Sequence, residues 1–391
     1  MGLNSILASS LRWSSSASTV AEADALLDKL WASSEARRFL VSDSPKASTT
    51  AEPIAVRTGV MNLAVVANGE ERAAHAASVL ATLPRNPSRT LFIVPRDPDG
   101  PPTFQARLEI FCAVTPRGDG TSACTELLWI DASGEAGRHL SSMVPQLSLH
   151  DLPTLLWWDH TVDPTSRDLR ELLRGVDRIL FSGAEQRGVG IEVVRDLITL
   201  SSASGTALSD FSLIRQARWR DAVASAFDEP EVAPYLHAIT KIRATYSAGS
   251  TLSVPANVVK PTYHLAWLAS RLNACVTAPL ENHAGTWSGA IDEEGRRIAL
   301  TLEPVVDAGR SGTTLALHIT AERRGGVLEL SVRADGESTH VRASINGTPV
   351  HERTLRAKRA TDAELLSQAL ELGEVDPLSP SILRTFAQLV G

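Results

Sequence analysis

Apolar positions in the first part of the chain switch between short runs and helical spacing. Apolar side chains at helical spacing between residues 20 and 31 predict an amphipathic helix that begins near Thr19. The apolar run 61–67 predicts a strand, the Asn68-Gly69 pair predicts a turn into a second helix, and 90–94 predicts a further strand. This order of strand, helix and strand favours an α/β layer with a mostly parallel or mixed sheet.

Two apolar stretches, 107–114 and 123–130, flank a turn-rich segment and predict a β-hairpin. A turn centred on Gly118 would place Cys112 and Cys124 directly opposite each other on neighbouring strands. Cross-strand partners have Cβ atoms about 5 Å apart, which local twist can shorten to disulfide distance. The two cysteines are therefore either small hydrophobic side chains of a core or a redox pair.

The rest of the first half continues the alternation of helices and strands. It predicts a helix at about 135–148, a strand at 152–158, a helix at about 165–174 and a strand at 177–182. We expect an N-terminal α/β domain over 19–205. The Ser-rich residues 1–18 are expected to be disordered, and 42–53 has the composition of a linker.

The second half is patterned differently. Helices are predicted at 210–227 and 260–272, and 232–248 alternates like a strand. Period-two patterning then predicts strands around 298–302, 315–319, 328–332 and 341–345. Asn346-Gly347 is typical of a type I′ hairpin turn. An antiparallel meander follows from this pattern, and with it an α+β C-terminal domain over 206–391.

Two helices are expected to close the chain. Thr361 and Glu364 have the spacing of a capping box at the start of the first helix. Ser379 and Pro380 predict an N-cap followed by a proline at the first helical position of the second.

Charge and cysteine content narrow the class of protein. The 391 residues carry 38 Lys and Arg against 45 Asp and Glu, a net charge of −7. That balance argues against a sequence-blind nucleic-acid binder but leaves a local basic patch open. Three cysteines are too few for a disulfide-stapled secreted fold, and no run approaches the ~20 apolar residues of a membrane helix. We expect a cytoplasmic protein that binds neither nucleic acid nor membrane.

Familiar catalytic and cofactor motifs are absent from the sequence. It contains no Gly-rich phosphate loop, no dinucleotide fingerprint and no nucleophile elbow, and its ten histidines are spread singly. We therefore expect no enzyme, no cofactor and no metal. The polar pair Asp159-His160 follows a predicted strand, where open α/β sheets often bind ligands. It is either a polar loop that caps the strand or the site of a sugar-phosphate-binding enzyme.

Tryptophan is unusually frequent, with 8 of the 19 aromatic residues. Trp157 and Trp158 are neighbours on one predicted strand, so their indoles point to opposite faces. Arg218, Trp219 and Arg220 form a second aromatic and basic group near a helix start. Each indole is either part of a core or an exposed anchor for a partner, since Trp and Arg dominate binding hot spots.

Several motifs occur in an order that resembles the OpcA family of glucose-6-phosphate dehydrogenase assembly proteins. They are Leu30-Trp31, Asn86-Pro87-Ser88-Arg89, Cys124-Thr125-Glu126, the segment 149–158 (Leu-His-Asp-Leu-Pro-Thr-Leu-Leu-Trp-Trp), Asp210 through Arg218-Trp219-Arg220, and Ala363-Glu364-Leu365-Leu366. The resemblance covers roughly residues 19–388 in order. The chain departs from the family pattern at Asn86 (usually His), His150 (usually Pro) and Asp159-His160 (usually Arg-Gly).

The resemblance implies a non-catalytic protein that binds glucose-6-phosphate dehydrogenase and promotes its active oligomer. Such a protein supports the oxidative pentose phosphate pathway as an allosteric activator. The residues we expect at the partner contact are Trp157, Trp158, Arg218, Trp219 and Arg220. A redox-sensing adaptor that uses Cys112 and Cys124 is a further hypothesis.

Overall fold

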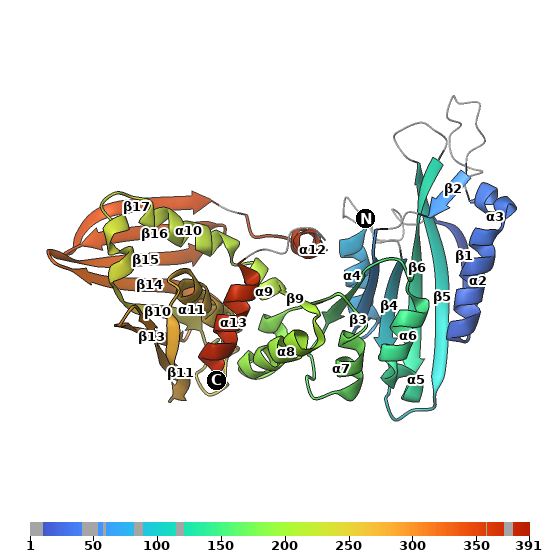
Figure 1. Ribbon diagram of the computed structural model, residues 1–391, viewed down its shortest axis with the longest axis horizontal. Helices are drawn as coiled ribbons and strands as arrows, with labels where there is room; N and C mark the ends of the chain where they lie inside the picture. Colours follow the sequence, from blue (N-terminus) through green and yellow to red (C-terminus); the bar gives the residue numbers. More distant parts are fainter. Residues whose placement is uncertain are drawn as a thin grey trace. The chain divides into compact units, whose positions relative to one another are not determined.

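The computed structural model describes residues 11–40, 54–57, 60–81, 89–114, 121–356, 358–370 and 378–391 (Figure 1). The chain divides into two compact units. The first comprises Met1–Phe181 and Leu200–Leu208, and the second comprises Ser182–Thr199 and Ser209–Gly391.

The first unit is built on a nine-stranded mixed sheet. Its strands are β1 (Leu11–Ala17), β2 (Ile54–Arg57), β3 (Asn62–Ala67), β4 (Arg89–Pro95), β5 (Thr103–Val114), β6 (Thr121–Ser133), β7 (Thr154–Asp159), β8 (Arg178–Phe181) and β9 (Ala207–Asp210). They lie in the order β1-β5-β6-β4-β3-β7-β8-β9, and β2 pairs with β6. The neighbours from β6 through β8 pair in parallel, whereas β5 pairs with β1 and β6 in antiparallel fashion. The predicted α/β fold is confirmed.

Helices cover both faces of this sheet. They are α2 (Val20–Ala32), α3 (Ser34–Phe39), α4 (Glu70–Leu80), α5 (Gly134–Arg138), α6 (Leu140–Leu147), α7 (Arg167–Leu173) and the end of α8 (Ile191–Ser204), of which residues 191–199 belong to the second unit. Thr19 caps α2, since its side chain accepts a hydrogen bond from the Glu22 amide. The helix predicted over 135–148 is instead two helices, because His139 between them has non-helical backbone angles (φ −109°, ψ 46°).

The N-terminal prediction needs a correction. Residues 11–17 were expected to be disordered, but they form β1, which pairs with β5 so that Ser15 lies opposite Leu108. A Ser-rich segment has little apolar area of its own, so its order depends on the backbone hydrogen bonds that β5 supplies. Residues 1–10, the predicted linker 42–53 and the predicted turn at 116–120 lie outside the described residues.

The second unit contains an eight-stranded sheet with one parallel pair, β10 with β13. Its strands are β10 (Ile239–Ser247), β11 (Cys275–His283), β12 (Thr286–Glu293), β13 (Arg296–Val305), β14 (Thr314–Arg323), β15 (Gly326–Asp335), β16 (Ser338–Ile345) and β17 (Thr348–Arg356). Asn346 (φ 52°) and Gly347 (φ 79°) make the predicted turn between β16 and β17. The antiparallel meander is confirmed, although β11, β12 and β17 were not predicted.

The helical elements of the second unit are η1 (Gly183–Glu185), α9 (Phe211–Ile214), α10 (Ala217–Phe227), η2 (Ala233–Ala238), α11 (Val259–Arg271), α12 (Asp362–Leu370) and α13 (Ser379–Val390). Helices α10, α11 and α13 pack against its sheet (Figure 1). The predicted capping box is confirmed: Thr361 N–H donates to Glu364 at 2.7 Å, and Glu364 N–H donates to Thr361 Oγ1 at 3.2 Å.

Three predictions in the second unit are wrong in detail. The helix expected over 210–227 is instead α9 and α10, because Gln216 between them has non-helical backbone angles. The strand expected over 232–248 begins only at Ile239, because 233–238 form the 3-10 helix η2, which has Pro234 at its second position. Ser379 is not the N-cap of α13, since Leu378 already has helical backbone angles and precedes it as the cap. The Pro380 ring therefore occupies the second helical position, which also needs no amide donor.

Candidate functional site

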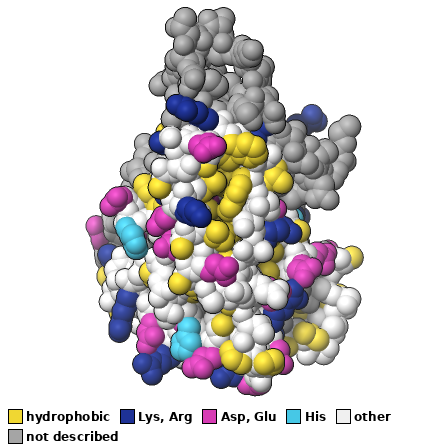
Figure 2. Space-filling view, turned by 90° about the vertical axis from the view of Figure 1, so that its right-hand side faces the viewer, with side chains coloured by type: hydrophobic (Ala, Val, Ile, Leu, Met, Phe, Trp, Pro, Cys, Tyr) yellow, Lys and Arg dark blue, Asp and Glu magenta, His cyan; other side chains and the backbone are white. Residues whose placement is uncertain are grey.

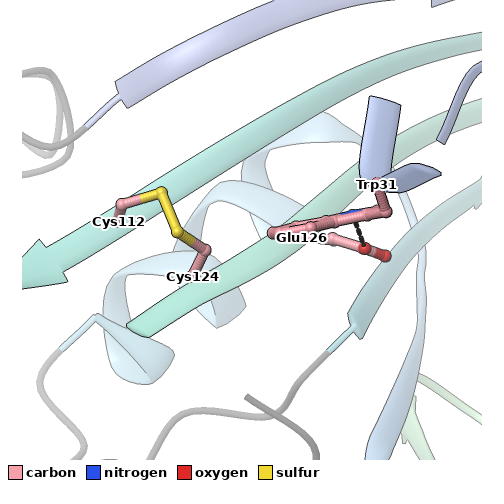
Figure 3. The surroundings of a disulfide bond; sticks show 4 residues. All are labelled: Trp31, Cys112, Cys124 and Glu126. Atoms are coloured by element: carbon pink, nitrogen blue, oxygen red, sulfur yellow. Dashed lines mark hydrogen bonds between the residues drawn. A yellow bond between two sulfur atoms is a disulfide. The ribbon is translucent and has the colours of Figure 1, made fainter. Parts of the chain in front are cut away.

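Glu126 is the centre of a buried ionic cluster in the first unit, and Figure 3 shows it with Trp31, one of its partners. Its carboxylate accepts hydrogen bonds from Trp31 Nε1 at 2.6 Å and from Arg89 Nε, and it pairs with Arg57 Nε at 2.7 Å. Glu126 is 0% exposed and Arg89 is 1% exposed. Arg89 also donates to the Leu147 carbonyl at 2.6 Å. A buried charge is stable only when it is paired in this way.

This cluster joins three of the sequence motifs. Trp31 ends the Leu-Trp motif on α2, Arg89 ends the Pro-Ser-Arg motif at the start of β4, and Glu126 closes the Cys-x-Glu motif on β6. The guanidinium of Arg57 on β2 also stacks over the Trp31 ring, 5.1 Å from its centroid. Burial lowers the pKa of Arg57, although the Glu126 charge opposes this shift. The three motifs and Arg57 therefore hold α2 and the strands β2, β4 and β6 together.

Cys112 and Cys124 form a disulfide beside this cluster (Figure 3). They lie directly opposite each other on β5 and β6, with Cα atoms 4.1 Å apart, so the predicted register is confirmed. Both side chains are buried and lie on the same sheet face as Glu126, two residues from Cys124. The third cysteine, Cys275 in the second unit, is exposed. A redox role for the pair remains a prediction.

Reduction of this disulfide is expected to destabilise the first unit. Closing a loop of this size contributes about 3 kcal/mol in the chain-entropy account. Treatment with dithiothreitol should therefore lower the thermal midpoint of wild-type protein and speed amide exchange in β5 and β6. Cys275→Ser should behave as wild type in both conditions, whereas Cys112→Ala should show the lower midpoint without reductant. An unchanged midpoint on full reduction would contradict this expectation.

A groove of about 580 Å³ runs over the other face of the same sheet, and we call it the sheet-face groove. Helix α4 borders it with Ala73, which packs with Ala67 and Val94. Its floor carries Phe92, which stacks on Trp129 with ring centroids 4.4 Å apart. Leu11, Phe111, Arg107, Glu109, Arg96 and Asp131 also line it. No local sequence pattern predicts this surface, because its residues come from four strands and one helix.

Charged side chains contact the Trp129 indole of the sheet-face groove and line the margin of the groove. The Arg107 guanidinium lies over the Trp129 ring, and Trp129 Nε1 donates to Glu109 at 2.8 Å. At the α4 side, Arg96 pairs with both Glu70 and Asp131 at 2.6 Å. These carboxylates raise the pKa of Arg96. The groove is thus apolar at its centre and charged at its margin, which is typical of protein interfaces.

Figure 2 shows one face of the first unit, on which hydrophobic side chains gather below the undescribed residues. Basic and acidic side chains surround them. Leu11 is 38% exposed and Phe111 is partly buried, so large apolar groups reach the surface of this unit. Contiguous exposed apolar area of this kind marks interaction sites more often than it marks inert surface.

Strand β7, which carries Trp157 and Trp158, does not line the sheet-face groove. Trp157 is only 5% exposed and belongs to the core, whereas Trp158 is partly exposed. Both Trp158 Nε1 and His160 Nδ1 lie within hydrogen-bond distance of the Thr161 carbonyl, at 3.3 and 2.7 Å. Asp159 is buried and pairs with Arg72 at 3.3 Å. Burial lowers the pKa of His160. The polar groups of this strand-end loop therefore engage one another.

The Arg218-Trp219-Arg220 group lies at the first turn of α10 in the second unit. Trp219 is 5% exposed and packs against the His264 ring, with centroids 5.0 Å apart. Arg218 and Arg220 are partly exposed. Burial lowers the pKa of Arg218. Of the five residues expected at a partner contact, Trp157 and Trp219 are thus too buried to offer much area to a partner. The other three are partly exposed and stay candidates for that contact: Trp158, Arg218 and Arg220.

Within the described ranges, no three His, Cys, Asp or Glu side chains are close enough together to hold a metal ion. A search of the same residues finds no helix with the length and apolar character of a membrane span.

The structure thus defines a protein of two units, one α/β and one α+β. The α/β unit contains a buried ionic cluster and a buried disulfide on one face of its sheet. Residues 76–194 match the family described as the glucose-6-phosphate dehydrogenase subunit N-terminal domain, and residues 206–379 match the corresponding C-terminal domain. The chain belongs to this OpcA family.

Curated relatives agree with this membership. An OpcA protein of Nostoc punctiforme, provisionally named for the OxPP cycle, is 27% identical over 192 residues, which are 48% of this chain and 38% of that protein. The Synechococcus elongatus protein of the same name is 26% identical over 207 residues, 52% of this chain and 43% of that protein. The aligned part of this chain spans about two-fifths of the length of these relatives.

Two oxidoreductases are among the solved structures to which this chain is distantly similar. KijD10, a 3-ketoreductase from Actinomadura kijaniata, has a TM-score of 0.47 at 10% identity and covers 85% of this chain and 97% of its own. An aldose-aldose oxidoreductase from Caulobacter crescentus has a TM-score of 0.43 at 10% identity, with the same coverage of the two chains. At these scores neither similarity bears on the activity of this chain.

Proposed function

We propose that this protein is a non-catalytic partner of glucose-6-phosphate dehydrogenase that promotes the active oligomer of that enzyme. The observation that carries the proposal is the family match over both halves of the chain, to domains described as parts of a glucose-6-phosphate dehydrogenase subunit. The names of the curated relatives refer to the OxPP cycle, in which this dehydrogenase would act. A place in the cytoplasm fits this role.

The mechanism that we propose is differential binding. A protein that binds the active oligomer more tightly than the inactive form shifts the population toward the active form by that difference in affinity. No reacting group of this chain is needed for such an effect. The buried Glu126 cluster would then serve to keep the sheet rigid, so that a surface presented by the first unit is preorganised for the partner.

We place the main contact in the sheet-face groove. Exposed Leu11 and partly buried Phe111 supply apolar area, and Trp129 with Arg107 supplies the aromatic and basic groups that are enriched at binding hot spots. Trp158, Arg218 and Arg220 remain candidates for additional contacts.

This proposal is tested by measuring the molar mass of the species that form when the protein is mixed with the cognate dehydrogenase. Light scattering of the cognate dehydrogenase with and without this protein should give a heavier species that contains both chains. The cognate enzyme is needed because a partner surface is specific. Two separate species at the highest concentrations used would overturn the proposal.

A further inference from the structure

A cavity of about 250 Å³ in the second unit is lined by basic side chains from four segments of the chain. Arg215 directly follows α9 and Arg218 lies in the first turn of α10, Lys260 comes from α11, Arg310 from the segment before β14, and Arg359 from the segment before α12. Among the described residues that line it, none is acidic. This concentration of positive charge occurs in a chain with a net charge of −7.

Nearby carboxylates offset only part of this charge. Asp362 pairs with Arg215 at 2.9 Å, and Glu185 lies 3.8 Å from Arg310. Burial, together with the charges of Arg310, Arg215 and Arg359, lowers the pKa of Lys260 to about 8. A partly buried ammonium group close to several guanidinium groups is unfavourable, and an anion in the cavity would relieve that repulsion.

Two deeply buried polar side chains in the same cavity have no hydrogen-bond partner among the described residues. His264 is 1% exposed, and neither of its ring nitrogens is bonded. Thr314 is 6% exposed, and its hydroxyl is also without a partner. Burial lowers the pKa of His264 to about 3, so its ring is neutral and presents one donor and one acceptor. Buried polar atoms are nearly always hydrogen-bonded, so these atoms are available to bond a polar ligand in the cavity.

We propose that this cavity binds a small sugar phosphate. Its phosphate lies against Arg215, Lys260 and Arg359, since guanidinium and ammonium groups are the usual partners of phosphate. Its hydroxyl groups bond to His264 and Thr314, which can donate and accept. The cavity is smaller than the roughly 300 Å³ at which sites for drug-sized ligands begin, which favours a monosaccharide phosphate over a dinucleotide.

Neighbouring packing supports the proposed orientation. Lys260 and His264 are four residues apart on α11, so they lie on one face of that helix. The Trp219 ring also lines the cavity and contacts His264, which gives the carbon side of a sugar an apolar surface. The proposal concerns the isolated chain and does not depend on a dehydrogenase partner.

Calorimetric titration of the full chain tests this site, with glucose 6-phosphate as the probe. We expect saturable binding of glucose 6-phosphate that is tighter than the binding of inorganic phosphate, and no binding of glucose. Lys260→Met and Arg359→Ser should each weaken binding by about tenfold or more, because each removes a charged partner of the phosphate. Arg359 is exposed, so its replacement should leave the fold intact even if Lys260→Met does not.

Arg324→Ser is the matched control, because Arg324 is an exposed arginine of the same unit that does not line the cavity. It should bind glucose 6-phosphate as wild type does. The proposal is overturned if glucose 6-phosphate does not bind at millimolar concentration. It is also overturned if Arg359→Ser binds it as tightly as Arg324→Ser does, or if ADP or inorganic phosphate binds more tightly than the sugar phosphate.

Discussion

Replacing Glu126 by leucine should lower the free energy of unfolding of the first unit by about 3–5 kcal/mol, the usual cost of breaking a buried ion pair from one side. The substitution removes the buried carboxylate that pairs with Arg89, which is 1% exposed, and leaves that guanidinium only the more distant Asp24 at 3.9 Å; it also removes the acceptor of Trp31 Nε1. Urea-dependent amide exchange in β4 and β6 would measure the loss, because exchange reports on the first unit separately from the second.

Glu109→Gln is the matched control for this loss. Glu109 lies on β5 and also bonds an indole and an arginine, but its partner Arg107 is largely exposed. Its replacement should cost less than about 1 kcal/mol, as exposed pairs do. The double variant Arg89→Met with Glu126→Leu should be less unstable than Glu126→Leu alone, since the fully buried Arg89 charge is removed together with its partner and only the partly exposed Arg57 loses one. Equal losses in Glu126→Leu and Glu109→Gln would show that the cluster is not the tie between α2 and the sheet.

Replacing Leu11 by aspartate should weaken binding of the dehydrogenase by about tenfold or more, which is about 1.4 kcal/mol. Leu11 is 38% exposed at the edge of the sheet-face groove, so water can solvate the new carboxylate in the free protein. In a complex the same carboxylate would lose that water, which weakens binding. Arg107→Glu tests the same surface through charge, because it removes the guanidinium over Trp129. Titration of the enzyme, followed by light scattering, gives both affinities.

Val306→Asp is the control for the Leu11 variant. Val306 is 57% exposed and lies in the second unit. Its replacement by aspartate therefore also puts a carboxylate in place of an exposed apolar side chain, but away from the groove. Binding by Val306→Asp should match that of wild type. If Leu11→Asp and Arg107→Glu both bind as wild type does, the sheet-face groove is not the contact, and attention moves to Trp158, Arg218 and Arg220.

Local patterns in the sequence predicted most of the fold. The strands β3, β4 and β7 are continuous apolar runs because they lie inside a parallel sheet, where both faces are covered. The register of Cys112 opposite Cys124 followed from the position of the turn between their strands. The Asn346-Gly347 turn and the Thr361 capping box were predicted because their geometry depends only on neighbouring residues.

Elements that depend on distant partners were missed. Strand β1 is Ser-rich and is ordered by its pairing with β5, about ninety residues away in the chain. Strand β11 has few buried side chains, so it lacks the alternation that marks a half-buried strand. The meeting of Trp31, Arg89 and Glu126 was hidden for the same reason, although each residue stood in a motif that the sequence analysis had found.

The surfaces were the least predictable part. Trp157 and Trp219 were expected at a partner contact on the basis of residue type, yet both are 5% exposed. Burial of a single indole is decided by tertiary packing, which a local pattern does not contain. Likewise, the basic cavity gathers Arg215, Lys260 and Arg359 from separate segments, in a chain whose overall charge is negative.

The activity of the cognate dehydrogenase, measured over a dilution series with and without this protein, tests the central claim most directly. Oligomers dissociate on dilution, so a protein that promotes the active oligomer should raise activity most at low enzyme concentration. We expect that activation to fade at high enzyme concentration and to coincide with a heavier complex in light scattering. Activity and mass that are unchanged by this protein at every enzyme concentration would contradict the account.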